Sequence, residues 1–327
     1  LEELLETKQV SFSYEEDLVG GIWENRPSLS AEPVWILDEK YTGKPASQKI
    51  EELRKAMKEE HADVHVLTTL DDIVWLLNIR GGDVPHNPVV LSYVVVTETE
   101  CFLFINEETL DDRLKAYLKG LQVTVKPYDH IYQFVKSFHR QRVLLERSRV
   151  NYAIVNNLDS SNKIIDRMNP TVMAKAVKNP VEIENERLAH IKDGVAVTKF
   201  MYWLKKNVGT IPMTEISVSD YLQSLRKEQE GYLEDSFNTI SAYGENAAMC
   251  HYSATPESNK TIEPKGLYLV DSGGQYYEGT TDITRTIAMG PLTDEEKEHF
   301  TLVAMSMLRL DMPDSSMAAE AFLWTMR

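Results

Sequence analysis

The spacing of apolar residues changes once along this chain, near residue 178, and this change constrains the fold more than any other feature. Before it, short β-rich runs alternate with helix-like stretches, which is typical of an α/β domain. After it, two long helical patterns precede several segments of alternating apolar and polar residues, which indicates an α+β domain with an antiparallel sheet. Pro170 and Pro180 punctuate the junction, because proline disfavours helix continuation. The sequence therefore predicts one unit over residues 40–178 and another over residues 179–327.

Strands and helices alternate in the predicted first unit. A helical pattern starts at Ser47, and two further helices are predicted over Asp71–Leu77 and Leu110–Leu118. The predicted strands are Val64–Leu67, Val89–Val96, Cys101–Ile105, Val123–Val125 and Val143–Leu145.

Helices come first in the predicted second unit. The strongest helical pattern of the chain covers Val181–Lys206, and another helix follows Thr214. Thr293 and Glu296 have the spacing of a capping box, which predicts a further helix. The predicted strands are Asn238–Ala242, Ala248–Tyr252, Leu267–Val270 and Thr281–Ala288.

Residues 1–39 are too few to build a core of their own. Leu1–Glu6 has helical spacing, but the segment after it is loop-like, with Pro27 and Pro33. We expect residues 1–39 to be the remnant of a preceding domain together with a linker.

Charge and composition exclude several classes of partner. The chain has 35 Lys and Arg against 51 Asp and Glu, a formal net charge of −16, which would repel nucleic acid and anionic membrane surfaces. The apolar runs fall short of the roughly 20 residues that a membrane-spanning helix needs. Only Cys101 and Cys250 occur, so no disulfide framework is indicated. We therefore expect a cytoplasmic protein with no nucleic-acid partner and no membrane partner.

Two aspartates are candidates for chemistry. Asp271 follows the apolar run Leu267–Val270, and Asp282 opens the next strand-like segment after a turn-rich stretch. If the two segments pair as a hairpin, the carboxylates lie side by side and require a shared proton or a cation between them. Oxygen ligands of this kind suit Mn²⁺, Co²⁺ or another divalent ion. A solvent-exposed hairpin with incidental acids is the alternative.

His251 is the third candidate. The predicted strand Ala248–Tyr252 would place it among buried neighbours, where it could donate a hydrogen bond to an oxyanion or transfer a proton. A structural histidine with satisfied hydrogen bonds is the alternative. Cys250 and His251 do not form a nucleophilic dyad on a strand, because adjacent side chains point to opposite faces. The sequence also lacks GxSxG, HExxH, P-loop and GxGxxG motifs.

Four motifs stand out in the last third of the chain: Phe237–Ser241, Glu245–Tyr252, Leu269–Tyr276 and Gly279–Thr286. Upstream motifs are Glu32–Tyr41, Asp72–Val84 with Asn87–Val89, Asn179–Ile183 and His190–Gly194. Taken together, these motifs resemble those of the Xaa-Pro aminopeptidases (aminopeptidase P) of the creatinase and prolidase superfamily, in their three-domain cytosolic type.

The resemblance implies a fold, a reaction and a metal site. It implies a creatinase-like middle domain over residues 40–178 and the N-terminal part of a pita-bread catalytic domain over residues 179–327. It implies two metal ions, usually Mn²⁺, held by two Asp, one His and two Glu. The implied reaction is hydrolysis of the bond between an N-terminal residue and a following proline, so the implied substrates are peptides with proline at the second position. Asp271 and Asp282 match the two Asp ligands, and His251 matches the histidine that contacts substrate. A homodimer is implied as well.

The sequence departs from the family in its last part. It has no HxxGHGxG-like motif, and the only histidine after Asp282 is His299, within a charged helical segment. We therefore expect a chain that is incomplete at both ends and inactive by itself, because the later metal ligands are missing. A prolidase-like dipeptidase and a non-catalytic pseudoenzyme or interaction module remain as alternative readings.

Overall fold

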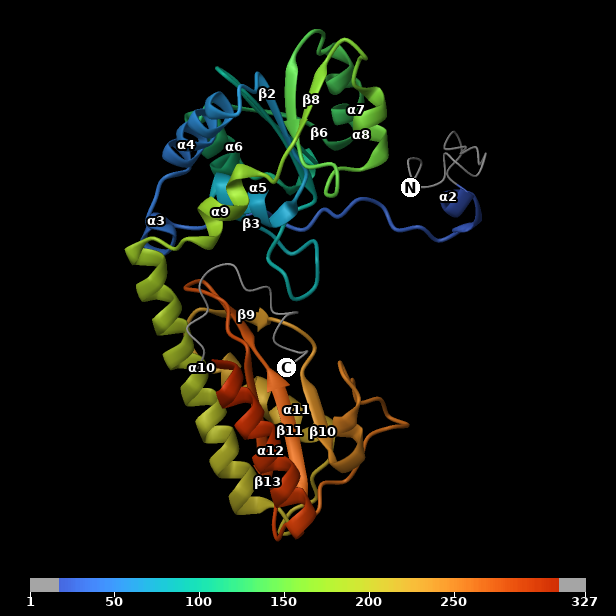
Figure 1. The fold of residues 1–327 in the computed structure, drawn as a ribbon, viewed down its shortest axis with the longest axis vertical. Helices are drawn as coiled ribbons and strands as arrows, with labels where there is room; N and C mark the ends of the chain where they lie inside the picture. The colour runs from blue at the N-terminus through green and yellow to red at the C-terminus, as the bar shows by residue number, and fades with distance from the viewer. Residues whose placement is uncertain (1–17, 312–327) are drawn as a thin grey trace.

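The computed structural model describes residues 18–311. Figure 1 shows two units, which follow one another along the long axis and are joined at the start of helix α10 (Pro180–Asn207). As predicted, the first unit is α/β and the second packs long helices against antiparallel strands. The helical spacing of Leu1–Glu6 and the segment 312–327 lie outside the described residues.

A six-stranded mixed sheet forms the centre of the first unit. Its strands are β2 (Val64–Leu67), β4 (Ser92–Thr97), β5 (Cys101–Ile105), β6 (Val123–Pro127), β7 (Arg142–Leu145) and β8 (Lys163–Asp166). They lie in the order β6-β5-β4-β2-β7-β8. The pairs β2–β4 and β4–β5 are antiparallel, and the pairs β2–β7, β5–β6 and β7–β8 are parallel.

Helices cover both faces of this sheet. One face is covered by α4 (Ala46–Glu59), α5 (Leu70–Leu77) and α6 (Asp112–Gly120), and the other by α7 (Ile131–Phe134) and α8 (Tyr152–Asn157). Successive side chains on a strand point to opposite faces of the sheet, so each strand contributes to a hydrophobic core on either face. On β4, Val94 and Val96 pack with the first helix group, while Tyr93 and Val95 pack with the second.

Shorter elements complete the first unit. They are α2 (Leu18–Ile22), α3 (Glu39–Thr42), α9 (Pro170–Ala176), the 3₁₀ helices η2 (Glu107–Thr109), η3 (Tyr128–His130) and η4 (Val135–Ser137), and the antiparallel pair β1 (Trp35–Ile36) and β3 (Ile79–Arg80). Among the helices within residues 18–311, none has the length and apolar character needed to cross a bilayer.

One predicted strand of the first unit starts later than expected. The prediction was Val89–Val96, but β4 begins at Ser92. Asp83 explains the difference, because its Oδ2 accepts a hydrogen bond from the backbone N of Leu91 at 2.6 Å. Its own backbone N donates to the carbonyl O of Val89 at 3.3 Å. These bonds hold the segment as a packed loop before the strand.

The second unit places two long helices against small antiparallel sheets. α10 and α11 (Glu215–Lys227) pack on a three-stranded sheet of β10 (Ile240–Tyr243), β11 (Leu267–Ser272) and β13 (Ile283–Ala288), in the order β10-β11-β13. A second pair joins β9 (Tyr232–Asp235) to β12 (Gly274–Tyr276). The remaining elements are η5 (Gly244–Ala248) and α12 (Asp294–Asp311).

Side-chain caps start all three of these helices. Asn179 and Thr214 form capping boxes at the first turns of α10 and α11. At α12, the backbone N of Glu296 donates to Thr293 Oγ1 at 3.2 Å, and Glu296 Oε2 accepts from the backbone N of Thr293 at 2.7 Å. The capping box predicted for this helix is therefore confirmed.

The two units contact each other through His86, in the loop between β3 and β4. Its backbone N donates to Glu234 Oε2 at 3.0 Å, and its ring Nδ1 lies 3.0 Å from the carbonyl O of Asp235. The side chain of Gln275 donates to the carbonyl O of His86 at 3.0 Å. This loop therefore holds the first unit against the β9–β12 pair.

The buried histidine of β2 should make the stability of the first unit depend on pH. His65 has no exposed surface, and its Nδ1 donates to the carbonyl O of Leu144 at 3.0 Å. Burial lowers the pKa of His65 from 6.5 to about 4. Between these values the unfolded chain binds a proton that the folded chain does not, so stability falls as the pH drops through this window. We expect a loss of about 2 kcal/mol from this residue between about pH 7.5 and about pH 5.

Urea unfolding followed by circular dichroism at both pH values would test this prediction. His65→Gln keeps a polar side chain of similar reach without a titrating proton, so it should lose about 2 kcal/mol less on acidification than the unchanged chain. An identical pH dependence for the two proteins would contradict the assignment.

Candidate metal centre

The structure brings Asp271 and Asp282 together on one face of the β10-β11-β13 sheet. Asp271 lies on β11 and pairs with Thr284 on β13, while Asp282 directly precedes β13. Side chains two residues apart on a strand share a face, so Asp282 lies diagonally across from Asp271. Along β11 the side chains of Tyr268, Val270 and Ser272 are buried, whereas Asp271 belongs to the alternate, partly exposed set. The pair therefore lies on the face opposite the helices.

The electrostatics of the pair show how close the two carboxyl groups are. Burial raises the pKa of Asp282, and the charge of Asp271 and a hydrogen bond to Asp271 raise it further. Each contribution raises this pKa, and none of the ion pairs within residues 18–311 includes Asp282. Asp271 Oδ1 also accepts a hydrogen bond from Thr284 Oγ1 at 2.7 Å.

This donor set fits a divalent cation. Two carboxylates held together without a neighbouring basic group are stabilised by a positive ion between them. Hard oxygen donors of this kind suit Mn²⁺ or Mg²⁺ better than soft ligands would. Residues 18–311 bring together no group of three or more His, Cys, Asp and Glu side chains that could hold a metal ion. The described chain therefore supplies two donors to such a site.

His251 does not lie on a strand, so that prediction is wrong. The segment predicted as the strand Ala248–Tyr252 instead ends the 3₁₀ helix η5 and continues as a turn. His251 has φ 57°, in the left-handed region, and its side chain is exposed. Among the hydrogen bonds of the described residues, none joins His251 to Asp271 or Asp282.

Glu215, at the start of α11, organises the segment that carries His251. Its carboxylate is completely buried. Oε1 accepts from the backbone N of Tyr243 at 2.7 Å and from Asn246 Nδ2 at 3.0 Å. Oε2 accepts from Tyr252 Oη at 2.8 Å and from the backbone N of Lys260 at 3.0 Å. The turn is thus anchored on both sides of His251, with the histidine ring left toward solvent.

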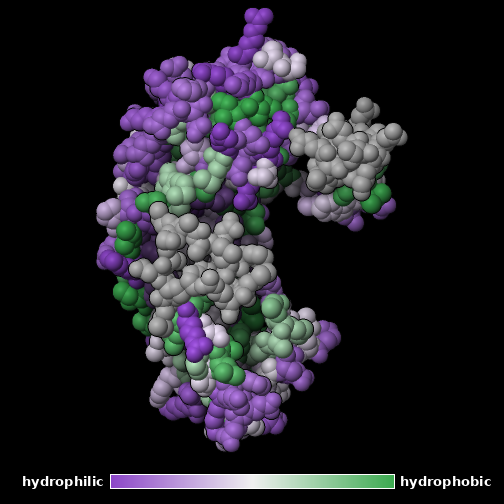
Figure 2. Space-filling model, in the orientation of Figure 1, coloured by the Kyte–Doolittle hydropathy of each residue, from purple (hydrophilic) through white to green (hydrophobic). Residues whose placement is uncertain are grey.

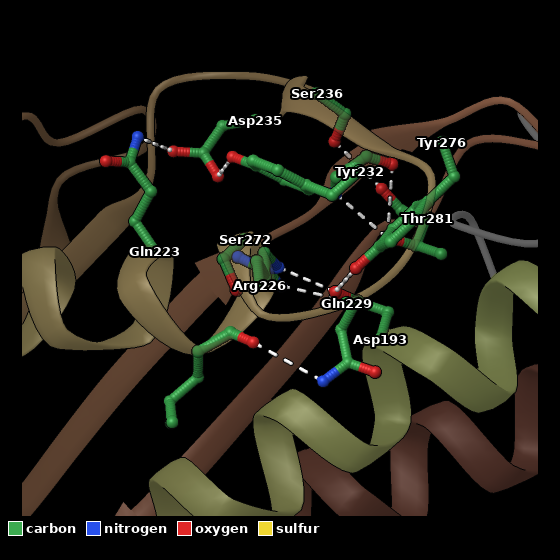
Figure 3. A network of polar contacts seen from close by, with 12 residues as sticks. Asp193, Gln223, Arg226, Gln229, Tyr232, Asp235, Ser236, Ser272, Tyr276 and Thr281 are labelled. Atoms are coloured by element: carbon green, nitrogen blue, oxygen red, sulfur yellow. Dashed lines mark hydrogen bonds and ion pairs between the residues drawn. The ribbon is translucent and has the colours of Figure 1, made fainter.

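A buried ion pair beneath the sheet was not predicted from the sequence. Arg226 Nε donates to Asp193 Oδ1 at 2.6 Å, and both side chains are completely buried. Figure 3 shows this pair within a wider polar network that includes Ser272 and Tyr276. Tyr276 Oη donates to Asp193 Oδ1 at 3.0 Å. Helix periodicity could have indicated the pair, because Asp193 and Arg226 occupy positions where the buried faces of α10 and α11 require inward-pointing side chains.

A separate cavity of about 420 Å³ lies between the two units. Its lining includes Lys49 and Arg80 from the first unit and Glu186 and Tyr277 from the second. Burial lowers the pKa of Lys49 to about 7 and that of Arg80 to about 10. None of Asp271, Asp282 and His251 lines this cavity. It is therefore distinct from the carboxylate pair.

Comparison with known proteins matches both units to described families. Residues 25–182 match the Creatinase/Prolidase N-terminal domain, and residues 184–310 match metallopeptidase family M24. A probable Xaa-Pro aminopeptidase P of Chaetomium globosum is 37% identical over 309 residues, which are 90% of this chain and 50% of that protein. Xaa-Pro aminopeptidase 1 of Dictyostelium discoideum is 35% identical over 338 residues, which are 99% of this chain and 52% of that protein.

A solved structure gives the same result for the fold. The X-prolyl aminopeptidase of Caenorhabditis elegans, described as a cytosolic enzyme with a di-nuclear active site, superposes with a TM-score of 0.88 at 35% identity. The match covers 94% of this chain and 52% of that one. The chain thus spans about half the length of the relatives it matches. It belongs to metallopeptidase family M24 and carries the creatinase/prolidase N-terminal domain ahead of its peptidase domain.

Proposed function

We propose that the whole protein is a metal-dependent aminopeptidase that hydrolyses the bond between an N-terminal residue and a following proline. The observation that carries the proposal is the juxtaposition of Asp271 and Asp282 within an M24 peptidase domain. The names of the relatives, which match most of this chain, support the choice of substrate. Peptides with proline at the second position are therefore the proposed substrates.

Asp271 and Asp282 are the proposed metal ligands of this chain, and Mn²⁺ is the proposed metal. When bound, divalent ions supply Lewis-acid chemistry, which polarises a carbonyl group and makes water more acidic. The two aspartates would hold such an ion on the open face of the sheet. Thr284 orients Asp271 by its hydrogen bond at 2.7 Å. The di-nuclear site described for the Caenorhabditis elegans enzyme supports the use of metal.

His251 is the proposed substrate-contacting residue. Its exposed ring and its left-handed backbone support this role, because non-glycine residues in that region are uncommon and cluster at functional sites. The anchoring of Tyr252 by Glu215 would keep the ring available to a bound peptide. His251 would then donate a hydrogen bond to the carbonyl oxygen under attack.

The domain assignment follows the two family matches. Residues 40–178 are proposed as the middle creatinase-like domain, and residues 179–327 as the N-terminal part of a pita-bread domain. Residues 1–39 are proposed as the remnant of a first domain with its linker. A cytoplasmic location is proposed from the net charge of −16 and the use of only two cysteines.

A homodimer is also proposed for the whole protein. Figure 2 shows apolar side chains on the outer edge along α10, and Leu188, Ile191, Val195 and Tyr202 are exposed on this helix. Their spacing places them along one side of the helix, where a second subunit could cover them. Sedimentation analysis should give twice the monomer mass, and a monomer at micromolar concentration would contradict the proposal.

Loss of either aspartate should abolish activity in the whole protein. Asp271→Ala and Asp282→Ala each remove a proposed ligand, so Mn²⁺-dependent release of the residue before proline should fall to background. Asp220→Ala is a matched control, because this aspartate lies on the exposed side of α11 in the same unit. Full activity of either ligand variant would refute the metal assignment.

The 327-residue chain by itself should hydrolyse no Xaa-Pro peptide measurably. Two carboxylates alone supply too few donors for a two-metal site, so calorimetry should show weak Mn²⁺ binding and no tight two-ion binding. Robust Mn²⁺-dependent hydrolysis by this chain would show that further ligands exist within it.

Removing the like charge should stabilise the metal-free chain. Asp282→Asn ends the repulsion with Asp271, so the free energy of unfolding near neutral pH should rise by about 0.5 kcal/mol, the scale of a partly exposed charge pair. The same variant should lose Mn²⁺ binding. Asp220→Asn, on the exposed side of α11, provides a charge-matched control. A destabilised Asp282→Asn chain would show that the pair is not strained.

A further inference from the structure

Each proposed metal ligand is next in sequence to a buried hydroxyl residue. Ser272 follows Asp271 and has 1% of its surface exposed. Thr281 precedes Asp282 and has 0% exposed. Neighbouring residues on a strand point to opposite faces of the sheet. A hydrogen bond that fixes the Ser272 side chain on the buried face therefore also fixes the direction in which the Asp271 side chain points on the open face.

Arg226 fixes Ser272 from below. Its Nη2 donates to Ser272 Oγ at 3.0 Å and to Asp193 Oδ2 at 3.2 Å. The guanidinium is held in turn by the bond from its Nε to Asp193. Figure 3 shows Arg226 beside Ser272 and linked to Asp193 on α10. The end of β11 is thus tied to both long helices.

Ser236 holds the backbone of Thr281. Its Oγ donates to the carbonyl O of Thr281 at 2.8 Å, the peptide group that leads directly into Asp282. Thr281 also pairs with Gly274, whose backbone N donates to Thr281 Oγ1 at 2.9 Å. The backbone N of Ser236 donates to the carbonyl O of Gly273 at 3.0 Å. Ser236 therefore links Gly273, directly after β11, to Thr281, directly before Asp282.

Gly273 allows this close approach. A Cβ at this position would lie 1.9 Å from the carbonyl O of Thr281 and 2.3 Å from Ser236 Oγ. Any side chain would therefore push the segment of Asp282 away from the segment of Asp271. The close contact of Gly273 with Thr281 thus joins the chain just after Asp271 to the chain just before Asp282.

We propose that Arg226 and Ser236 are positioning residues that set the spacing of the Asp271 and Asp282 carboxylates by holding the residue next to each of them. The proposal rests on the proposed metal site. Arg226 acts through Ser272, and Ser236 acts through Thr281. Their combined effect is a carboxylate pair of fixed geometry, which discriminates among divalent ions by the geometry that each ion requires.

The energetics of the network favour a positioning role over a packing role. A buried ion pair such as Asp193 with Arg226 adds little stability compared with apolar residues of the same volume, because both charges are removed from water. What such a pair supplies is a fixed direction for each hydrogen bond. Here one of those bonds ends at the residue beside a proposed ligand.

Ion selectivity provides the test, because partial unfolding changes all affinities by the same factor and leaves their ratio unchanged. Mg²⁺ requires near-octahedral geometry at about 2.0–2.1 Å, whereas Ca²⁺ accepts flexible geometry at about 2.3–2.6 Å. Electron paramagnetic resonance of free Mn²⁺ would report binding to the 327-residue chain. Competition with Mg²⁺ and with Ca²⁺ would then give the affinity ratio for each variant.

Ser272→Ala and Ser236→Ala each delete one anchoring hydroxyl. We expect each variant to shift the ratio of the Ca²⁺ and Mg²⁺ affinities toward Ca²⁺ by about threefold. This is less than the roughly tenfold loss of metal affinity that follows removal of a direct hydrogen-bond partner of a metal ligand. Ser241→Ala is the matched control, because Ser241 is a buried hydroxyl of the same sheet that bonds Glu215 O at 2.6 Å. Its ratio should not change.

The outcomes separate this inference from the proposed function. Unchanged ratios in both anchor variants, or an equal shift in Ser241→Ala, would overturn the positioning role while leaving the metal site intact. Mn²⁺ binding that is absent, or that survives Asp271→Ala, would refute the proposed metal site and the inference with it.

Discussion

The buried ion pair of Asp193 and Arg226 joins the elements on which the second unit depends. It connects α10 to α11, and through Ser272 and Tyr276 it reaches the ends of β11 and β12. Desolvation of both charges means that neither can be left without its partner. The two helices and the end of the central strand β11 are therefore held in one arrangement, and the aspartate pair lies at that end of the sheet.

The parts of the fold that the sequence predicted are those determined by local pattern. Cys101–Ile105 is a strand because a short apolar run with β-branched and aromatic neighbours has few alternatives in an α/β domain. The position of Asp271 beside Asp282 was also predictable, because both flank segments with clear strand periodicity. In each case, residues close in sequence determine the result.

The errors arose where distant residues decide the conformation. Ala248–Tyr252 has the composition of an apolar strand, yet Glu215 binds Asn246 and Tyr252 and folds the segment into a 3₁₀ helix and a turn. No local signal encodes a carboxylate 31 to 45 residues away in the chain. The same reasoning applies to Arg226, whose buried position depends on Asp193 and on Ser272 46 residues later.

The aspartate pair shows why the scaffold beneath it must be rigid. Two carboxylates that repel each other would separate if the backbone could move, and the charge density that attracts a cation would fall with their separation. On the open face, Asp271 accepts a hydrogen bond from Thr284. The backbone before Asp282 is restrained separately, because Ser236 donates to the preceding carbonyl and Gly273 permits the close approach. Repulsion between the two carboxylates is balanced by directional bonds to the neighbouring residues Ser272 and Thr281, and the geometry of the candidate site follows from that balance.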